Sequence, residues 1–346
     1  MALLMLPQEV ILHIMECLGS DYLRQDINRL FISKKWFQAA QFTMLQHLTV
    51  TSTLLRTLVA ASEQGKVALD LEKHLQSMYL SFNGMNKAPL PRKRRKLSHC
   101  SIGDGLQHEE NHSDEPMDDY LWTYTFNERI IRLRGILERC EKFKTLRIEA
   151  REEQPNLPRD MHNRPYLVGS ALLSLLDLAA LQNLTLDLHG SDVIEDVYYR
   201  ERVHFCTNIR RLFSRLKSFE CRMSTICPDL LSAGTSSEKL QLEVVIVNLC
   251  IGTAHSPKIP YRYPTRCNAG RQRSFGQLRN DMEMQAELLC DSMRQPRIVR
   301  VISHEAATLQ HQTFDAVTKK LYEFDPSGPW SGQGKLIEDE SSGVDE

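Results

Sequence analysis

Short segments of alternating apolar residues recur along the chain and constrain its fold more than any other feature of the sequence. They share a period of two, which is typical of a strand with one buried face, and they comprise residues 75–82, 143–148, 181–188 and 216–221. A pattern of helical period precedes the last three, over residues 130–140, 167–181 and 208–216. One strand and one helix cannot bury their apolar faces alone. Successive units are therefore expected to stack and to pair their strands in parallel.

The apolar residues of these segments resemble the Leu-x-x-Leu-x-Leu core of a leucine-rich repeat. The units are about 30 to 40 residues apart, which is longer and less regular than the usual repeat. The predicted fold class is therefore α/β, with an irregular, leucine-rich-repeat-like solenoid of strands and helices; an α/β sandwich of another topology is the alternative. Residues 242–250 are nearly continuously apolar, as in a parallel strand covered on both faces, and residues 297–302 form the last predicted strand.

The first fifty residues carry the most regular helical pattern in the chain. The first helix is expected to end at Gly19, which suits a left-handed backbone conformation. The apolar residues at helical spacing are Val10, Ile11, Ile14 and Leu18, followed by two further stripes within residues 23–31 and 36–48. Three short helices make a unit below the size at which one core gives ample stability. Their apolar surface exceeds what they can bury among themselves, and such a surplus is typical of an interaction site.

Two short motifs occur in this region: Leu6-Pro7-Gln8-Glu9 at its start, and Ser33-Lys34-Lys35-Trp36 near its end. Together with the apolar stripes they resemble the F-box of substrate receptors in SCF-type cullin–RING ubiquitin ligases, especially fungal ones. The resemblance covers residues 3–50 and implies docking on a Skp-type adaptor. The candidate docking residues are Leu6, Pro7, Val10, Ile11, Ile14 and Trp36. The alternative is a plain helical cap on a larger domain, and the polar residues 22–26, Arg24 among them, depart from the usual second F-box helix.

Composition divides the rest of the chain into four parts. Residues 51–83 hold the first strand–helix units, residues 84–120 are expected to be a disordered insertion, residues 121–324 a leucine-rich-repeat-like α/β region that binds substrate, and residues 325–346 a disordered acidic tail. Within the insertion, a basic run matches a nuclear localisation signal: Arg92, Lys93, Arg94, Arg95 and Lys96. The alternatives are a contact with nucleic acid or an acidic protein, and a solvated charge run.

A long loop over residues 256–276 interleaves arginine with tyrosine. Guanidinium groups bind carboxylates and phosphates well, so the loop suits an acidic peptide, a phosphorylated residue or nucleic acid. The candidate substrate contacts are Tyr261, Arg262, Tyr263, Arg266 and Arg271. A solvated loop is the alternative.

The charge and cysteine content exclude several kinds of partner and site. The 346 residues carry a net charge of −1, so no overall field attracts nucleic acid or an anionic membrane, and no apolar run approaches the roughly 20 residues of a membrane span. Nine cysteines without a Cys-x-x-Cys pair indicate reduced thiols, as in the nucleus or cytoplasm. Cys221 and Cys227 have no histidine nearby at ligand spacing, which favours ordinary buried thiols over a zinc site. No metal is expected.

No catalytic motif occurs in the sequence. Residues 332–335 superficially suggest a phosphate-binding loop but lack its spacing and its hydroxyl. The chain is therefore expected to be non-catalytic and to need no cofactor. The resemblance to the F-box implies a receptor that joins a Skp-type adaptor and its cullin–RING ligase to an unidentified protein substrate. The alternative is a nuclear scaffold that binds nucleic acid or protein through the basic run and the Arg/Tyr loop, without a role in ubiquitin ligation.

Overall fold

The computed structural model describes residues 6–65, 68–84, 115–151, 166–191, 193–194, 204–232, 238–251, 263–267, 274–304 and 310–337. In these residues the chain forms a mixed α/β fold built on one large, mostly parallel sheet. The predicted class is confirmed at this level.

The large sheet has ten strands in the order β1-β2-β3-β5-β7-β8-β9-β10-β11-β12. From β1 to β9, neighbouring strands are parallel and follow their order in the chain. These strands are β1 (His47–Thr51), β2 (Ser77–Asn83), β3 (Thr145–Arg151), β5 (Asn183–Leu188), β7 (Ser218–Met223), β8 (Val244–Asn248) and β9 (Ile298–His304). An antiparallel edge follows, formed by β10 (His311–Asp315), β11 (Lys320–Glu323) and β12 (Lys335–Leu336). A separate two-stranded sheet pairs β4 (Leu167–Val168) with β6 (Val193–Ile194).

Rows of buried side chains cross the parallel sheet, because its register aligns equivalent positions of successive strands. One row consists of Met78, Leu146, Leu184, Phe219, Val245 and Val299. The next consists of Leu80, Ile148, Leu186, Cys221, Val247 and Val301. Burying one aliphatic or aromatic side chain of this size contributes about 1.5–3 kcal/mol. The strands predicted from the apolar alternation at 75–82, 143–148, 181–188 and 216–221 are thus confirmed as β2, β3, β5 and β7.

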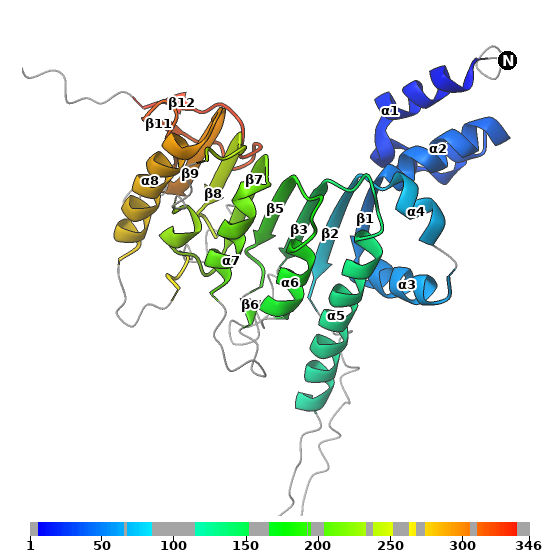
Figure 1. The fold of residues 1–346 in the computed structure, drawn as a ribbon, viewed down its shortest axis with the longest axis horizontal. Coiled ribbons are helices and arrows are strands. Elements are labelled where there is room, and N and C mark those ends of the chain that lie inside the picture. Colours follow the sequence, from blue (N-terminus) through cyan, green and yellow to red (C-terminus); the bar gives the residue numbers. More distant parts are fainter. Residues whose placement is uncertain are drawn as a thin grey trace, which may run out of the picture.

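Helices cover the face of the sheet to which these rows point (Figure 1). They are α3 (Ser52–Glu63), α5 (Glu115–Leu137), α6 (Gly169–Leu176), α7 (Phe205–Arg211) and α8 (Phe275–Ser292), with α4 (Ala68–His74) between α3 and β2. Two short 3-10 helices, η4 (Leu212–Ser214) and η5 (Pro228–Leu230), follow α7 and β7. On the opposite face, Ile246 of β8 and Ile302 of β9 pack with Phe324 and Trp330. The predicted burial of β8 on both faces is therefore confirmed.

The N-terminal helices pack on a small core of their own, beyond β1 at one edge of the sheet (Figure 1). They are α1 (Gln8–Gln25), the 3-10 helix η2 (Ile27–Leu30) and α2 (Lys34–Gln46). Gly19 interrupts α1 with φ 76° and ψ 160°, so the predicted break is present but its backbone is extended rather than left-handed helical. Ser33 starts α2 by accepting a hydrogen bond from the Trp36 amide. The buried residues of this core are Ile11, Met15, Leu23, Leu30, Trp36, Ala39 and Ala40.

The C-terminal region extends further than the sequence indicated. Three strands follow β9, which is therefore not the last one; β11 has the sequence Lys-Leu-Tyr-Glu, and such a short polar strand shows no apolar alternation. The sequence predicts an acidic tail over residues 325–346, yet Trp330 packs on the body and Lys335–Leu336 pairs with β11. The predicted boundary at 325 is thus too early. Similarly, α5 already begins at Glu115, within the predicted insertion, whose residues 85–114 lie outside the described part of the chain.

Candidate functional site

The surface of the N-terminal helices exposes several large apolar side chains. Phe31 is 66 % exposed and Ile32 51 % exposed, although both follow a helix that packs on the small core. Phe31 stacks on Phe37 with 6.0 Å between ring centroids. Val10 and Tyr22 of α1 are also exposed. These helices therefore bury one apolar face and present other apolar side chains to solvent.

The candidate docking residues divide into two groups. Pro7 and Val10 are exposed, and Leu6 and Ile14 are half-buried at the margin of the small core. Ile11 and Trp36 are buried in it. The Trp36 indole donates a hydrogen bond to the Arg29 carbonyl at 2.6 Å, which fixes the turn between η2 and α2.

Arg24, which departs from the usual F-box pattern, has a structural role. Its guanidinium donates hydrogen bonds to the carbonyls of Met44 and His47, at the end of α2, and to the Thr49 hydroxyl in β1. The last carbonyls of a helix have no partner within the helix, so a cation there satisfies them and also complements the helix dipole. Arg24 therefore joins α1, α2 and the first strand of the sheet.

The sheet face opposite the helices carries polar and charged side chains. Arg147 lies over the ring of Tyr79, with its guanidinium carbon 4.9 Å from the ring centroid. The Tyr79 hydroxyl donates a hydrogen bond to Glu149. Burial and this carboxylate raise the pKa of Tyr79 above its ordinary value, so the phenol stays protonated.

One ion pair on this face joins a buried carboxylate to a partly buried guanidinium. Arg222 donates two hydrogen bonds to the carboxylate of Asp187, both at 2.7 Å, and His189 contacts the same carboxylate at 2.8 Å. Burial by itself would raise the pKa of Asp187, but the hydrogen bonds from His189 and Arg222 outweigh it, and the pKa lies well below its ordinary value. Arg222 also lies over the ring of Trp330. The pair therefore links β5, β7 and the segment after β11.

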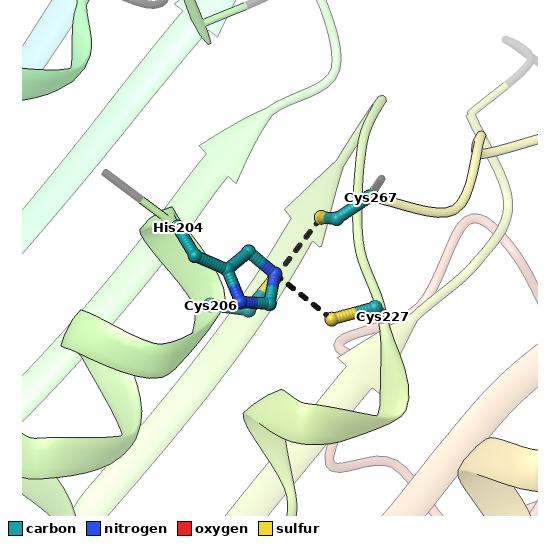
Figure 2. A group of neighbouring side chains, drawn as sticks. All are labelled: His204, Cys206, Cys227 and Cys267. Atoms are coloured by element: carbon teal, nitrogen blue, oxygen red, sulfur yellow. Dashed lines mark hydrogen bonds between the residues drawn. The ribbon is translucent and has the colours of Figure 1, made fainter. Parts of the chain in front are cut away.

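Four side chains with metal-binding chemistry meet beyond the carboxyl end of β7: His204, Cys206, Cys227 and Cys267 (Figure 2). Their ligand atoms all lie within 4.8 Å of one another. Cys227 Sγ is 3.1 Å from His204 Nε2, and Cys206 Sγ is 3.6 Å from Cys267 Sγ. Hydrogen bonds from the thiols of Cys206 and Cys267 lower the pKa of Cys227. We call this set the Cys3His group.

Three separate segments supply the Cys3His group. His204 and Cys206 come from the start of α7, and Cys227 directly precedes η5. Cys267 follows Thr265, whose amide donates to the Ser224 carbonyl and whose carbonyl accepts from the Ile226 amide. Backbone pairing thus places the third segment beside the second.

A smaller group of possible ligands consists of Cys250, His304 and His311. His304 Nδ1 is 3.0 Å from Cys250 Sγ, and the His304 ring stacks on Tyr263 at 4.9 Å between centroids. Burial, aided by the neighbouring His311, lowers the pKa of His304 to about 4. His304 is therefore neutral near pH 7.

Two of the five candidate substrate contacts fall within the described residues, and both engage the body of the protein. Tyr263 packs against Phe275 with tilted rings and stacks on His304. Arg266 forms an ion pair with Asp281 of α8. Tyr261, Arg262 and Arg271 lie outside the described part of the chain, as does the basic run Arg92, Lys93, Arg94, Arg95 and Lys96.

The Cys3His group is not predicted from the sequence, where Cys221 is the nearest cysteine to Cys227. Cys221 is a fully buried residue of β7 and does not belong to the group. The histidine beside Cys227 comes from position 204 and the third thiol from position 267, so no local spacing joins them. The only local signal is His204-x-Cys206, two ligand-type side chains at the start of one helix.

No protein-family model matches the chain, and no curated protein matches it. Across the described residues, every helix is too short or too polar to span a bilayer. The N-terminal helices, the polar sheet face and the Cys3His group remain as the features with functional chemistry.

Proposed function

We propose that the chain is the substrate-recognition subunit of an SCF-type cullin–RING ubiquitin ligase and that its N-terminal helices are an F-box that docks on a Skp-type adaptor. The main support is the separation of two cores. The buried residues of the N-terminal helices form one cluster, and those of the sheet and its helices form another. A small module that packs by itself, yet exposes Val10, Phe31 and Ile32, suits binding to a partner.

In this proposal, the docking surface includes Leu6, Pro7, Val10 and Ile14, which lie at or near the surface. Ile11 and Trp36 are buried, so their role is to hold the helices that present this surface. Arg24 then fixes the module to β1 through its bonds to the end of α2.

The remainder of the chain is proposed to be an irregular, leucine-rich-repeat-like solenoid that holds a protein substrate. The support is the order of the parallel strands, each of which pairs with the one before it in the large sheet. The polar sheet face offers the half-exposed guanidinium of Arg147 to a substrate, while Glu149 is buried beside it. Such a receptor acts by proximity, because it raises the effective concentration of the substrate near the ubiquitin-charged enzyme. The proposed location is the nucleus or cytoplasm, with residues 92–96 as the import signal.

The docking proposal is tested by the affinity of the purified full chain for a recombinant Skp-type adaptor. Val10→Glu places a charge on the proposed surface and is expected to weaken binding by at least about 30-fold, the effect of a hot-spot substitution. Val317→Glu is the matched control, since Val317 lies at the other end of the sheet and is 40 % exposed, against 41 % for Val10. The double variant Leu6→Ala, Pro7→Ala is expected to weaken binding as well.

Equal affinity of the Val10→Glu protein, the double variant and the wild type would exclude the docking assignment. The alternative function, a nuclear scaffold for nucleic acid, predicts that the chain is retained on DNA or RNA. This retention should decrease steeply as the salt concentration rises, because phosphate contacts release counterions.

A further inference from the structure

The donor atoms of the Cys3His group have the spacing of ligands around one tetrahedral ion. With Zn–S distances of about 2.3 Å and a Zn–N distance of about 2.0 Å, two sulfur ligands lie about 3.8 Å apart, and a sulfur and a nitrogen about 3.5 Å apart. The distances of 3.6 Å between Cys206 and Cys267 and 3.1 Å between Cys227 and His204 are close to these edges. In Figure 2 the thiols of Cys227 and Cys267 point toward the imidazole from one side.

The donor set also selects the metal. Thiolate and imidazole are the ligands that zinc takes in structural sites, and three cysteines with one histidine form a closed four-coordinate shell. Cys206 and Cys227 are buried, so the shell is largely shielded from water. We propose that His204, Cys206, Cys227 and Cys267 bind a structural zinc ion.

The surroundings of His204 prepare it for this role. Its Nδ1 atom is 2.7 Å from the Thr207 hydroxyl and 3.8 Å from the Asp229 carboxylate. A partner on Nδ1 sets the tautomer and leaves the lone pair of Nε2, the atom beside Cys227, for the metal. Histidine ligands of zinc commonly have such an outer partner, because it orients the ring and raises the basicity of the ligand.

Binding is a proton-releasing reaction without a change of oxidation state. The zinc ion replaces one proton on each of the three thiols and takes the neutral imidazole as its fourth ligand. The resulting centre of Zn²⁺ and three thiolates carries one negative charge. A disulfide between Cys206 and Cys267 is a different outcome, since it needs an oxidant and a sulfur–sulfur distance of about 2.05 Å.

The zinc ion would join three segments that are far apart in the sequence. It would join the start of α7 and the start of η5 to residues 263–267. Two backbone hydrogen bonds already hold that segment to residues 224–226, directly after β7. Tyr263 and Arg266 belong to that segment. The metal would thus fix the segment that carries Tyr263 and Arg266, whether or not the N-terminal helices bind an adaptor.

The zinc content of the full chain, purified with a reductant and without chelators, tests this inference. Elemental analysis is expected to find about one zinc ion per chain. Cys227→Ser is expected to reduce it to below about a tenth of that value, because metal binding and local folding are coupled. Cys221→Ser is the matched control, a fully buried thiol outside the group, and Cys250→Ser reports on the smaller group. Both controls are expected to retain the zinc.

Cobalt substitution gives a second measurement that does not depend on whether Cys227→Ser folds. Co²⁺ added to the metal-free wild-type chain is expected to show thiolate charge-transfer and tetrahedral d–d absorption bands. Thr207→Val keeps all four ligands and is expected to weaken zinc binding by about 10-fold through loss of the Nδ1 partner. The inference is overturned by a wild-type chain that holds no zinc and gives no thiolate–cobalt bands, by full zinc retention in Cys227→Ser, or by a Cys206–Cys267 disulfide in protein alkylated at lysis.

Discussion

Replacing Asp187 by asparagine is expected to lower the free energy of unfolding by about 3 kcal/mol. The substitution keeps the size of the side chain but removes the charge that faces Arg222, and it leaves a guanidinium whose side chain is only 19 % exposed without its partner. Breaking a buried ion pair in this way typically costs about 3–5 kcal/mol, and the partial exposure of Arg222 places the value at the lower end. At about 2 °C per kcal/mol for a chain of this size, the melting temperature falls by about 6 °C.

An exposed ion pair serves as the control, because it separates the effect of burial on stability from the effect of the distance between the charges. Arg132 and Glu63 are 2.5 Å apart, closer than the 2.7 Å of the Asp187 pair, but both side chains are more than half exposed. Arg132→Gln is therefore expected to change stability by less than about 1 kcal/mol. Urea unfolding followed by circular dichroism at pH 7 gives both values.

The contribution of Asp187 to the free energy of unfolding should also depend on pH in a known direction. The pKa of Asp187 is lower in the folded chain than in the unfolded chain, so its contribution is fully present above about pH 4 and is lost as the pH falls further. The stabilities of wild type and Asp187→Asn should therefore converge in acid. A loss below about 1 kcal/mol at pH 7, or an equal loss in Arg132→Gln, would refute the reasoning.

Three further predictions follow from the geometry. Trp36→Ala should lower the stability of the N-terminal helices by about 3 kcal/mol, because it leaves a cavity in their small core. Amide hydrogen exchange should then accelerate across residues 8–46, while the sheet keeps its protection. Acceleration throughout the chain would contradict two separate cores. Arg24→Met should lose the bonds to the end of α2 and about 2 kcal/mol of stability, which thermal unfolding measures, and an unchanged melting temperature would show that the contact contributes nothing. Burial lowers the pKa of His304 to about 4, so the unfolded chain binds a proton between about pH 6.5 and 4 that the folded chain does not. As the pH decreases through this window, the free energy of unfolding should decrease by up to about 3 kcal/mol. In urea titrations, His304→Phe should remove most of this pH dependence. An identical pH dependence in the variant would assign it to other groups.

The parts of the fold that the sequence predicted are those where burial follows a local period. Buried and half-buried side chains alternate along β7 and along β2 as far as Phe82, and this pattern is visible in the sequence. Gly19 marked the break in α1 because a positive φ favours glycine. β10 and β11 are not predicted because their short segments are polar, and because β10 depends on pairing with β9 and β11 on pairing with β10.

The functional groups were less predictable because they depend on contacts between distant segments. Arg24 looked like a departure from a binding motif, and only the position of the end of α2 shows what its guanidinium does. Cys267 meets Cys206 through the pairing of Thr265 with the chain after β7. Neither contact leaves a periodic trace in the sequence.

The order of the parallel strands has a consequence for synthesis of the chain. Each strand from β2 to β9 in the large sheet pairs with a strand that the ribosome has already released. The nascent chain can therefore lengthen the sheet one strand at a time, without waiting for a distant carboxyl-terminal partner, and the open edge exists only until the next strand arrives. The antiparallel strands β10, β11 and β12 then end the growth of the sheet, as the last of the described strands to leave the ribosome.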